Sequence, residues 1–519
     1  MTVVATDERR QDPAADRPHL GVVFYVSLTL AVAFIGVGLA MPEWLTGALV
    51  AAQEFVLDTV GHAYPVTVLA LLLFVLGLAV SPIGRERLGK PGERPAFGWL
   101  SWFAMLLSAG VGLSYLFWGT AQPLLHAAEP PYGAAAPGSA EAAKMGMRYS
   151  YLFWGIHAWA IYAVVAIAVA YASFRRGNRV LISAALRPLL GDRVDGVLGK
   201  VIDVFVVFAI LFGIATSLGL GSRELNSGLA HAFGLPESYG IQIAIIAGLM
   251  TVSTISAMTG LARGIRILSL INIGLCAALL LFVLATGPTA RVAGSLVDGV
   301  RDYFAYFLPM SLATESGPQP GWKQDWIFFF WAWWISWAPF VGTFIARISK
   351  GRTIRSVVTG VVLVPGAVTV VWFSVFGGTT LDRARSGAVD MADVAQHGKA
   401  VVTFNVLGTL PFPRITAVVV VVVLALLFIT SADSASFMLG SSTSGGSMKP
   451  PRPLRLLWAF GAAFAAVLLL TGGTESLQGA AVVAAIPFAV ILVGLGISLI
   501  VAVLQDRRKR RRDAPAERR

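Results

Sequence analysis

Apolar runs of about twenty residues recur along the whole chain and limit the folds that are open to it. Residues 19–40 and 63–82 are two examples. A helix of that length crosses the roughly 30 Å hydrocarbon core of a bilayer, where each backbone polar group needs a partner within the protein. Only 13% of the 519 residues are charged, against roughly 25% in soluble domains. The sequence therefore predicts an all-α polytopic membrane protein.

Twelve such segments follow one another, and we expect each to be a transmembrane helix. They are 19–40, 63–82, 97–121, 149–174, 199–222, 239–258, 266–287, 324–346, 356–377, 413–438, 454–472 and 478–504.

Positive charge is concentrated in every second connection between these segments. Lys and Arg gather in cytoplasmic loops of membrane proteins, so the net charge of +12 is better explained by topology than by nucleic-acid binding. An even number of spans then places both termini in the cytoplasm of a multi-pass cell-membrane protein. The tail is expected to contact anionic lipid. The basic segments are 85–94, 175–187, 263–266, 347–355, 449–455 and 507–512.

Two spans contain residues that can interrupt a helix. Gly110 and Gly112 lie in SAGVGLS (108–114), where they allow either close helix packing or a break that exposes backbone groups. Pro339 and Gly342 predict a second irregularity, in the eighth span. The two spans are five apart, which is the pattern of two inverted five-helix repeats preceded by two extra helices.

This pattern divides the chain into six parts. The amphipathic connection is expected to lie on the outer membrane surface. The parts are a cytosolic extension (1–17), two N-terminal helices (18–94), a first repeat (95–287), an amphipathic connection (288–323), a second repeat (324–504) and a basic cytosolic tail (505–519).

Aromatic side chains are concentrated in two spans. Five tryptophans lie within 326–342, and Trp154, Trp159 and Tyr162 lie within ten residues of one another in the fourth span. A single aromatic stripe more often serves packing. Two stripes beside small residues favour a box for a cation without hydrogen-bonding groups, to which each ring contributes roughly 0.5–2 kcal/mol.

Few ionisable residues fall inside the spans, so each is a candidate for function. Asp433 is interpreted either as a structural carboxylate capped by Ser431, Ser434 or Ser436, or as an ion ligand. His157 is expected to be a buried, hydrogen-bonded histidine rather than a proton carrier, and Asp203 to be structural. The single cysteine, Cys276, excludes a disulfide, and the sequence lacks HExxH, Walker-lysine and GxSxG motifs. An enzyme is therefore not expected.

Several segments together resemble the betaine/carnitine/choline transporter family. The resemblance covers all twelve spans, and it implies a LeuT-like core of two inverted repeats, a homotrimer and trimethylammonium substrates, most commonly glycine betaine. The segments are FWGIHAWAIY (153–162), FGIATSLGLG (212–221), TGLARGIRILSLIN (259–272), WAWWISWAPFVGTFIARISKGRTIR (331–355) and FITSADSAS (428–436).

Carried over to this chain, the resemblance implies that Trp334 completes a box with the three aromatic residues of the fourth span. The segment with Gly110, Gly112 and Ser114 would face the substrate carboxylate. The resemblance also implies a neighbouring path or gate at Trp333 and Trp337, and a cytoplasmic exit at Phe340 and Phe344.

The resemblance further implies one sodium site, with no other cofactor. Hydroxyl ligands would come from Thr430 and Ser431, and carbonyl ligands from Ser108, Val111 and Leu427. Betaine symporters of the family have a second sodium site with threonine ligands. The matching positions here are Ile210 and Ile214, which offer no oxygen, although Thr216 and Ser217 lie nearby. Ser114 mildly favours betaine over choline, and Asn272 replaces the arginine of sodium-independent exchangers.

We therefore expect a sodium symporter that imports glycine betaine or a related compatible solute by alternating access. Three alternatives remain: a proton-coupled choline importer that uses His157 or Asp433, a sodium-independent exchanger, and a membrane sensor that binds betaine without moving it. Each is distinguished by which gradient, if any, drives uptake.

Overall fold

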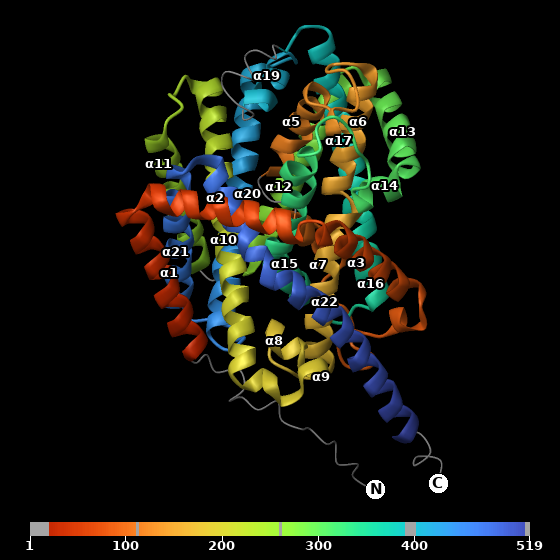
Figure 1. Ribbon diagram of the computed structural model, residues 1–519, viewed down its shortest axis with the longest axis vertical. Coiled ribbons are helices and arrows are strands. Elements are labelled where there is room, and N and C mark those ends of the chain that lie inside the picture. Colours follow the sequence, from red (N-terminus) through yellow and green to blue (C-terminus); the bar gives the residue numbers. More distant parts are fainter. Residues whose placement is uncertain (1–19, 111–113, 259–261, 390–400, 514–519) are drawn as a thin grey trace.

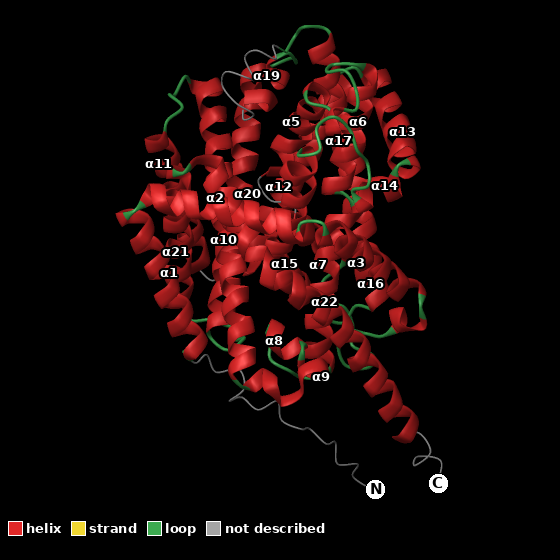
Figure 2. Ribbon diagram, in the orientation of Figure 1, coloured by secondary structure: helices red, strands yellow, loops and turns green. Residues whose placement is uncertain are grey.

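The computed structural model describes residues 20–110, 114–258, 262–389 and 401–513. Within these ranges the chain is helical, with one isolated bridge between Arg87 and Thr353, as Figure 2 shows. The principal helices are α1 (Val22–Ala40), α2 (Pro42–Val60), α3 (Ala63–Val80), α4 (Trp99–Gly110), α5 (Ser114–Ala128), α6 (Ala140–Trp154), α7 (Ile156–Ala170), α8 (Ile182–Ala185), α9 (Arg187–Leu190), α10 (Val197–Phe233), α11 (Tyr239–Met258), α12 (Ala262–Thr286), α13 (Thr289–Ala305), α14 (Phe307–Leu312), α15 (Phe329–Ile348), α16 (Ile354–Val358), α17 (Val364–Arg385), α19 (Val402–Gly408), α20 (Pro413–Thr443), α21 (Arg452–Thr471) and α22 (Gly473–Asp513).

Short turns join or extend these helices. They are η1 (Pro82–Arg85), η2 (Pro131–Gly133), η3 (Tyr171–Arg175), η4 (Gly191–Asp195), η5 (Gln324–Phe328) and η6 (Thr359–Leu363).

Ten helical segments of the described chain are long and apolar enough to cross a membrane. Each coincides with one of the predicted spans. The two remaining predictions, 97–121 and 239–258, coincide with α4 and α5 and with α11, where the apolar stretches Trp99–Ser108 and Tyr239–Ile255 are shorter. The chain is thus a polytopic helical membrane protein.

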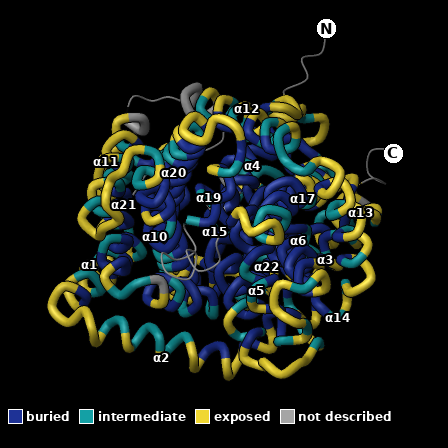
Figure 3. The backbone as a smooth tube through the Cα atoms, turned by 90° about the horizontal axis from the view of Figure 1, so that it is seen from above, coloured by how far each residue is buried: buried dark blue, intermediate teal, exposed yellow. Residues whose placement is uncertain are grey.

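The centre of the molecule is formed by α7 and α15. Figure 3 shows α15 surrounded by buried segments, and every residue of α7 from His157 to Ala170 is buried. The two helices approach closely at Gly342, because a Cβ added there would lie 2.4 Å from the Cβ of Val165. Glycine at this position therefore allows tight packing of the two most buried helices.

The predicted break in the eighth span is wrong. Helix α15 continues through Pro339 to Ile348. Proline removes one helical hydrogen bond, but a membrane helix enclosed by neighbours tolerates the loss. In the third span, α4 ends at Gly110 and α5 begins at Ser114. Val111 and Gly112 lie outside the described residues.

The connection between the first two predicted spans, residues 41–62, contains the helix α2. Pro42 occupies its first position and Glu43 its first turn, and both residues favour a helix start. Figure 1 shows α2 lying across the long helices. It packs on α22, where a Cβ on Gly479 would meet the backbone oxygen of Leu49 at 2.9 Å.

The amphipathic connection is mostly helical, because α13 and α14 occupy most of it. Val292, Gly299 and Tyr303 are buried on one side of α13, and a Cβ on Gly299 would meet the ring of Tyr151 at 2.8 Å. The position of α13 on the outer membrane surface stays a prediction.

Four of the predicted basic segments meet at one end of the molecule, the lower end in Figure 1, where α22 ends and α1 begins. The backbone N–H of Leu88 donates to the oxygen of Arg352 at 2.8 Å. Arg175 donates to the oxygen of Gly89 at 3.0 Å, and Arg507 and Arg510 pair with Glu86. The loops therefore share one side, as the charge pattern predicts, although their cytoplasmic location stays a prediction.

Candidate substrate and ion site

The fourth span is interrupted at Gly155, between α6 and α7. A Cβ at this position would lie 2.4 Å from the backbone oxygen of Tyr151, so the local conformation requires glycine. The break leaves carbonyls of α6 without partners in the helix. The indole N–H of Trp334 donates to the oxygen of Phe153 at 2.8 Å, and the hydroxyl of Thr369 donates to the oxygen of Trp154 at 2.8 Å. Side chains of α15 and α17 thus complete the broken end.

Four predicted box residues lie together beside this break. The ring centroids of Trp154 and Trp334 are 4.9 Å apart at 86°. Tyr162 lies 6.0 Å from Trp334 at 84°, and Trp159 lies 5.8 Å from Tyr162 at 87°. All four side chains are buried. The rings contact one another edge to face, so a cation that binds among them must part them.

The residues predicted for the neighbouring path divide into two groups. Trp333 stacks on Trp334 at 5.5 Å and 15°, and therefore belongs to the same aromatic cluster. Trp337 faces α10, where its indole N–H donates to the oxygen of Gly213 at 2.9 Å. Phe340 lies 6.0 Å from Trp337, while Phe344 is buried further along α15.

Residues of α5 and α17 for which the sequence offered no prediction also surround Trp154. The indole N–H of Trp154 donates to Gln122 at 2.5 Å, and the rings of Tyr115 and Phe373 lie 5.6 and 6.0 Å away. The hydroxyl of Tyr115 donates to Thr369. The signal that could have found Tyr115 is the aromatic segment that directly follows the glycines of the third span.

Gly110 lies against the same cluster. A Cβ there would meet the indole of Trp159 at 2.6 Å, so close packing, one of the two expected roles, is confirmed for this glycine. Ser114 is the first residue of α5.

The predicted sodium ligands are partly brought together. Ser108 and Leu427 line one cavity of about 240 Å³, together with Asn272 and Tyr115. The hydroxyl of Thr430 donates to the oxygens of Leu426 at 2.9 Å and Leu427 at 3.1 Å on its own helix.

The side-chain oxygens of Ser108 and Ser431 are buried and lack a hydrogen-bond partner among the described residues. A buried polar atom without a partner costs about 1–3 kcal/mol. Oxygen ligands are those that a hard cation prefers, so these residues fit a small cation such as sodium.

At the position of a second ion, the nearby hydroxyl groups donate hydrogen bonds to backbone oxygens. Ile210 and Ile214 are buried and apolar. Thr216 donates to the oxygen of Leu477 at 2.8 Å, and Ser217 donates to that of Gly213 at 3.1 Å.

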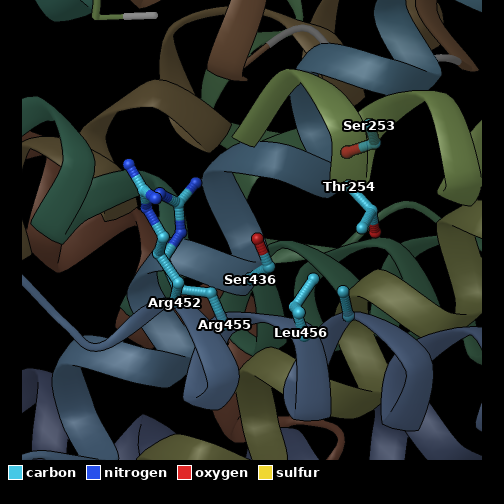
Figure 4. Close-up of a pocket in the computed structure, with 7 residues that line it drawn as sticks. Ser253, Thr254, Ser436, Arg452, Arg455 and Leu456 are labelled. Carbon is cyan, nitrogen blue, oxygen red and sulfur yellow. The ribbon is translucent and has the colours of Figure 1, made fainter. Parts of the chain in front are cut away.

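The serine caps expected for Asp433 are wrong. Its carboxylate pairs with the guanidinium of Arg455 at 2.5 Å, and Ser436 donates to the backbone oxygen of Asp433 rather than to the carboxylate. Figure 4 shows Arg455 and Ser436 at a small pocket that Ser253 and Thr254 also line. Its volume of about 10 Å³ suits roughly one water molecule, which is too little for an organic substrate.

The other two ionisable residues are hydrogen-bonded, as expected. The ring nitrogens of His157 lie 2.8 Å from the hydroxyl of Ser311 and 3.3 Å from that of Tyr303. Asp203 accepts hydrogen bonds from the backbone N–H and the hydroxyl of Ser183.

A membrane-spanning helix that is interrupted near its middle, as the fourth span is at Gly155, is typical of the binding sites of secondary transporters. The sequence model that defines the betaine/carnitine/choline family of transporters matches residues 22–508 of this chain. The chain belongs to this family, and it is a transporter rather than an enzyme.

Three relatives indicate the range of named substrates. The chain is 41% identical to the glycine betaine transporter OpuD of Bacillus subtilis, over 95% of this chain and 96% of the relative. It is 37% identical to an osmo-independent choline transporter of Acinetobacter baylyi, over 90% of each chain. It is 35% identical to an ectoine/hydroxyectoine transporter of Virgibacillus pantothenticus, over 95% of this chain and 98% of the relative.

Proposed function

We propose that the protein imports glycine betaine, or a related trimethylammonium solute, by sodium symport and alternating access. The observation that carries the proposal is the cluster of Trp154, Trp159, Tyr162 and Trp334 at the break between α6 and α7. A trimethylammonium group offers no hydrogen bond, so aromatic faces are its natural partners. The 41% identity to a glycine betaine transporter supports this substrate.

The proposal includes the architecture expected from the sequence. Twelve spans would form two inverted five-helix repeats, at 95–287 and 324–504, behind two N-terminal helices. Both termini would be cytoplasmic, and the protein would be a homotrimer in the cell membrane. The meeting of the basic loops at one end supports the topology.

Sodium would bind near Ser108, Leu427 and Ser431. Ser108 Oγ and Ser431 Oγ are buried and have no hydrogen-bond partner in the part of the chain that the structure describes, and this supports a cation there. One sodium ion that moves down 100 mV gains roughly 2.3 kcal/mol from the field. This energy would drive accumulation of a zwitterionic substrate.

A proton-coupled choline importer is the second candidate, favoured by the named choline transporter at 37% identity. Its expected proton carriers are already engaged, because His157 contacts two hydroxyls and Asp433 is paired with Arg455. This engagement supports sodium over protons as the coupling ion.

Uptake of labelled glycine betaine into proteoliposomes tests the proposal. An inward sodium gradient should drive accumulation, while a potassium control should not. Uptake that follows a proton gradient and ignores sodium would favour the second candidate. Transport of choline without any transport of betaine would overturn the substrate assignment.

The aromatic cluster has its own matched test. Trp334→Leu should weaken betaine binding by about tenfold or more, the loss of roughly 1.4 kcal/mol of ring contact. Trp458→Leu is the control, because it removes a buried indole of α21 that donates a hydrogen bond to Thr443 of α20, outside the aromatic cluster. It should leave betaine affinity unchanged. Equal losses in both variants would remove the cluster from the site.

A further inference from the structure

A polar cleft of about 630 Å³ lies at the end of the molecule where the basic loops meet. It is bounded by the first residues of α1, the segment around α8, the beginning of α10 and the end of α20. Its charged lining residues are Arg179, Arg187, Asp195, Lys200 and Asp203.

The charges of this cleft are unevenly paired. Arg187 is bound to Asp195 at 2.5 Å and to Asp192 at 3.2 Å, and Asp203 is hydrogen-bonded to Ser183. Arg179 and Lys200 are exposed, and neither forms an ion pair within the described part of the chain. Two cations are therefore available to an anionic group.

An apolar groove of about 600 Å³ begins where the polar cleft ends. Val22 and Lys200 line both. The groove runs between α1, α10 and α22, and its residues repeat at intervals of three or four along each helix. They include Val22, Val26 and Leu30 of α1, Val197, Val201, Phe205, Phe208 and Phe212 of α10, and Val483 and Pro487 of α22.

These side chains form an exposed apolar stripe rather than a closed core. Val197 is 76% exposed, Val22 53% and Phe205 43%. From Val197 to Phe212 the helix rises by roughly 22 Å, which exceeds the roughly 15 Å of one leaflet of the hydrocarbon core. The groove is thus long enough to hold an acyl chain along its full depth in one leaflet.

We propose that the cleft and groove form a binding site for one anionic phospholipid. The phosphate of the headgroup contacts Arg179 and Lys200, and an acyl chain lies against the apolar stripe to which α1, α10 and α22 all contribute. The continuity of the charged cleft with the groove distinguishes this site from a site for free phosphate, which would use only the cleft. The site is separate from the aromatic cluster, so it stands whether or not betaine is the substrate.

Lipid binding to the purified full-length protein tests the headgroup part. Native mass spectrometry with phosphatidylglycerol and phosphatidylcholine of equal chain length should show a preference for phosphatidylglycerol. In the double variant Arg179→Gln/Lys200→Gln, the ratio of phosphatidylglycerol to phosphatidylcholine affinity should fall. The expected decrease is about fivefold for each cation removed, which corresponds to about 1 kcal/mol each. Arg193→Gln removes an exposed arginine outside the cleft and should keep the preference. An unchanged preference in the double variant would overturn the proposal.

A second variant tests the acyl part. Val201→Trp, at a position 42% exposed in the groove, should reduce retention of phosphatidylglycerol, while Val252→Trp on α11, 48% exposed outside it, should not. Inorganic phosphate should fail to stabilise the protein thermally under conditions in which phosphatidylglycerol does. Equal stabilisation by both would assign the cleft to a soluble anion and overturn the lipid site.

Discussion

The span that carries Trp154 breaks at Gly155, whereas the facing helix α15 runs unbroken through Pro339. Proline is the residue more hostile to a helix interior, so composition alone predicts the opposite. The difference lies in the partners available. At Gly155 the freed carbonyls accept hydrogen bonds from Trp334 and Thr369, which no sequence pattern reports. Inside a membrane protein a helix is interrupted where its exposed backbone can be satisfied by neighbours.

The largest effect is expected from Gly155→Ala. The added methyl would lie 2.4 Å from the Tyr151 oxygen, so the break must move and Trp334 loses its acceptor. Betaine uptake in proteoliposomes should fall by more than tenfold, with a lower melting temperature. Gly248→Ala, where a Cβ meets nothing within 4 Å, is the control and should be silent. Normal uptake by Gly155→Ala would show that the break is dispensable.

A smaller loss is expected from Trp334→Phe. This change keeps an aromatic face but removes the N–H that completes the Phe153 carbonyl, at a cost of about 1–3 kcal/mol for the buried acceptor. This cost falls on the folded protein with and without betaine, so it should appear mainly as a lower melting temperature, and betaine affinity measured by calorimetry should fall by less than about tenfold. An affinity equal to that of the native protein would mean that the ring face alone matters and that the bond to α6 does not.

Pro339→Ala should have little effect, because the helix already continues through this residue. Restoring one backbone hydrogen bond within a packed helix is expected to change the free energy of unfolding by about 0.5–1.5 kcal/mol. Thermal unfolding in detergent measures it, and uptake should be retained. A loss of uptake comparable with that of Gly155→Ala would restore Pro339 to the role that the sequence suggested.

The smallest effect is expected at the end of α22, where Arg507 and Arg510 form ion pairs with Glu86. Burial raises the pKa of Glu86, but hydrogen bonds and charge from Arg510 and Arg507 outweigh it and hold that pKa below its ordinary value of 4.5. A carboxylate with a depressed pKa stabilises above its unfolded pKa, and this contribution is lost as pH falls through the folded pKa.

Hydrogen exchange near Arg507 should therefore be unchanged between pH 7 and 5, once corrected for intrinsic rates, and increase below about pH 4.5. Glu86→Gln should show increased exchange already at pH 7. The free energy of local opening should fall by at most about 1 kcal/mol. Glu237→Gln, in the connection before α11, is the control. Protection that is independent of Glu86 would mean that apolar packing alone holds the tail.

The sequence predicts the helical spans well, because apolar length alone determines what crosses a bilayer. It also predicts which aromatic residues cluster, since Trp154 and Trp334 lie in recognisable segments. It does not predict α2, although Pro42 and Glu43 favour a helix start there, because three acidic residues distinguish this segment from the apolar spans on either side. It misses the partner of Asp433, because Arg455 lies 22 residues away on another helix, and nearby serines look equally suitable.

The substrate cluster was only partly predictable for a similar reason. Tyr115, Gln122 and Phe373 reach Trp154 from α5 and α17, and no local pattern relates these helices to the fourth span. Ser108 and Leu427 were placed by resemblance, and the structure adds that both line one cavity. Such relations arise from the packing of distant segments, and one sequence does not encode them as a readable pattern.

The hydrogen bonds at the broken end of α6 have a consequence for engineering the protein. Gly155 directly follows α6, and Trp334 of α15 and Thr369 of α17 donate hydrogen bonds to the last carbonyls before it. A graft that transfers only the ring residues between relatives would leave the recipient with a mismatched backbone. Substrate preference should therefore be exchanged as a unit of all three helices, and libraries that vary single rings would sample mainly damaged proteins.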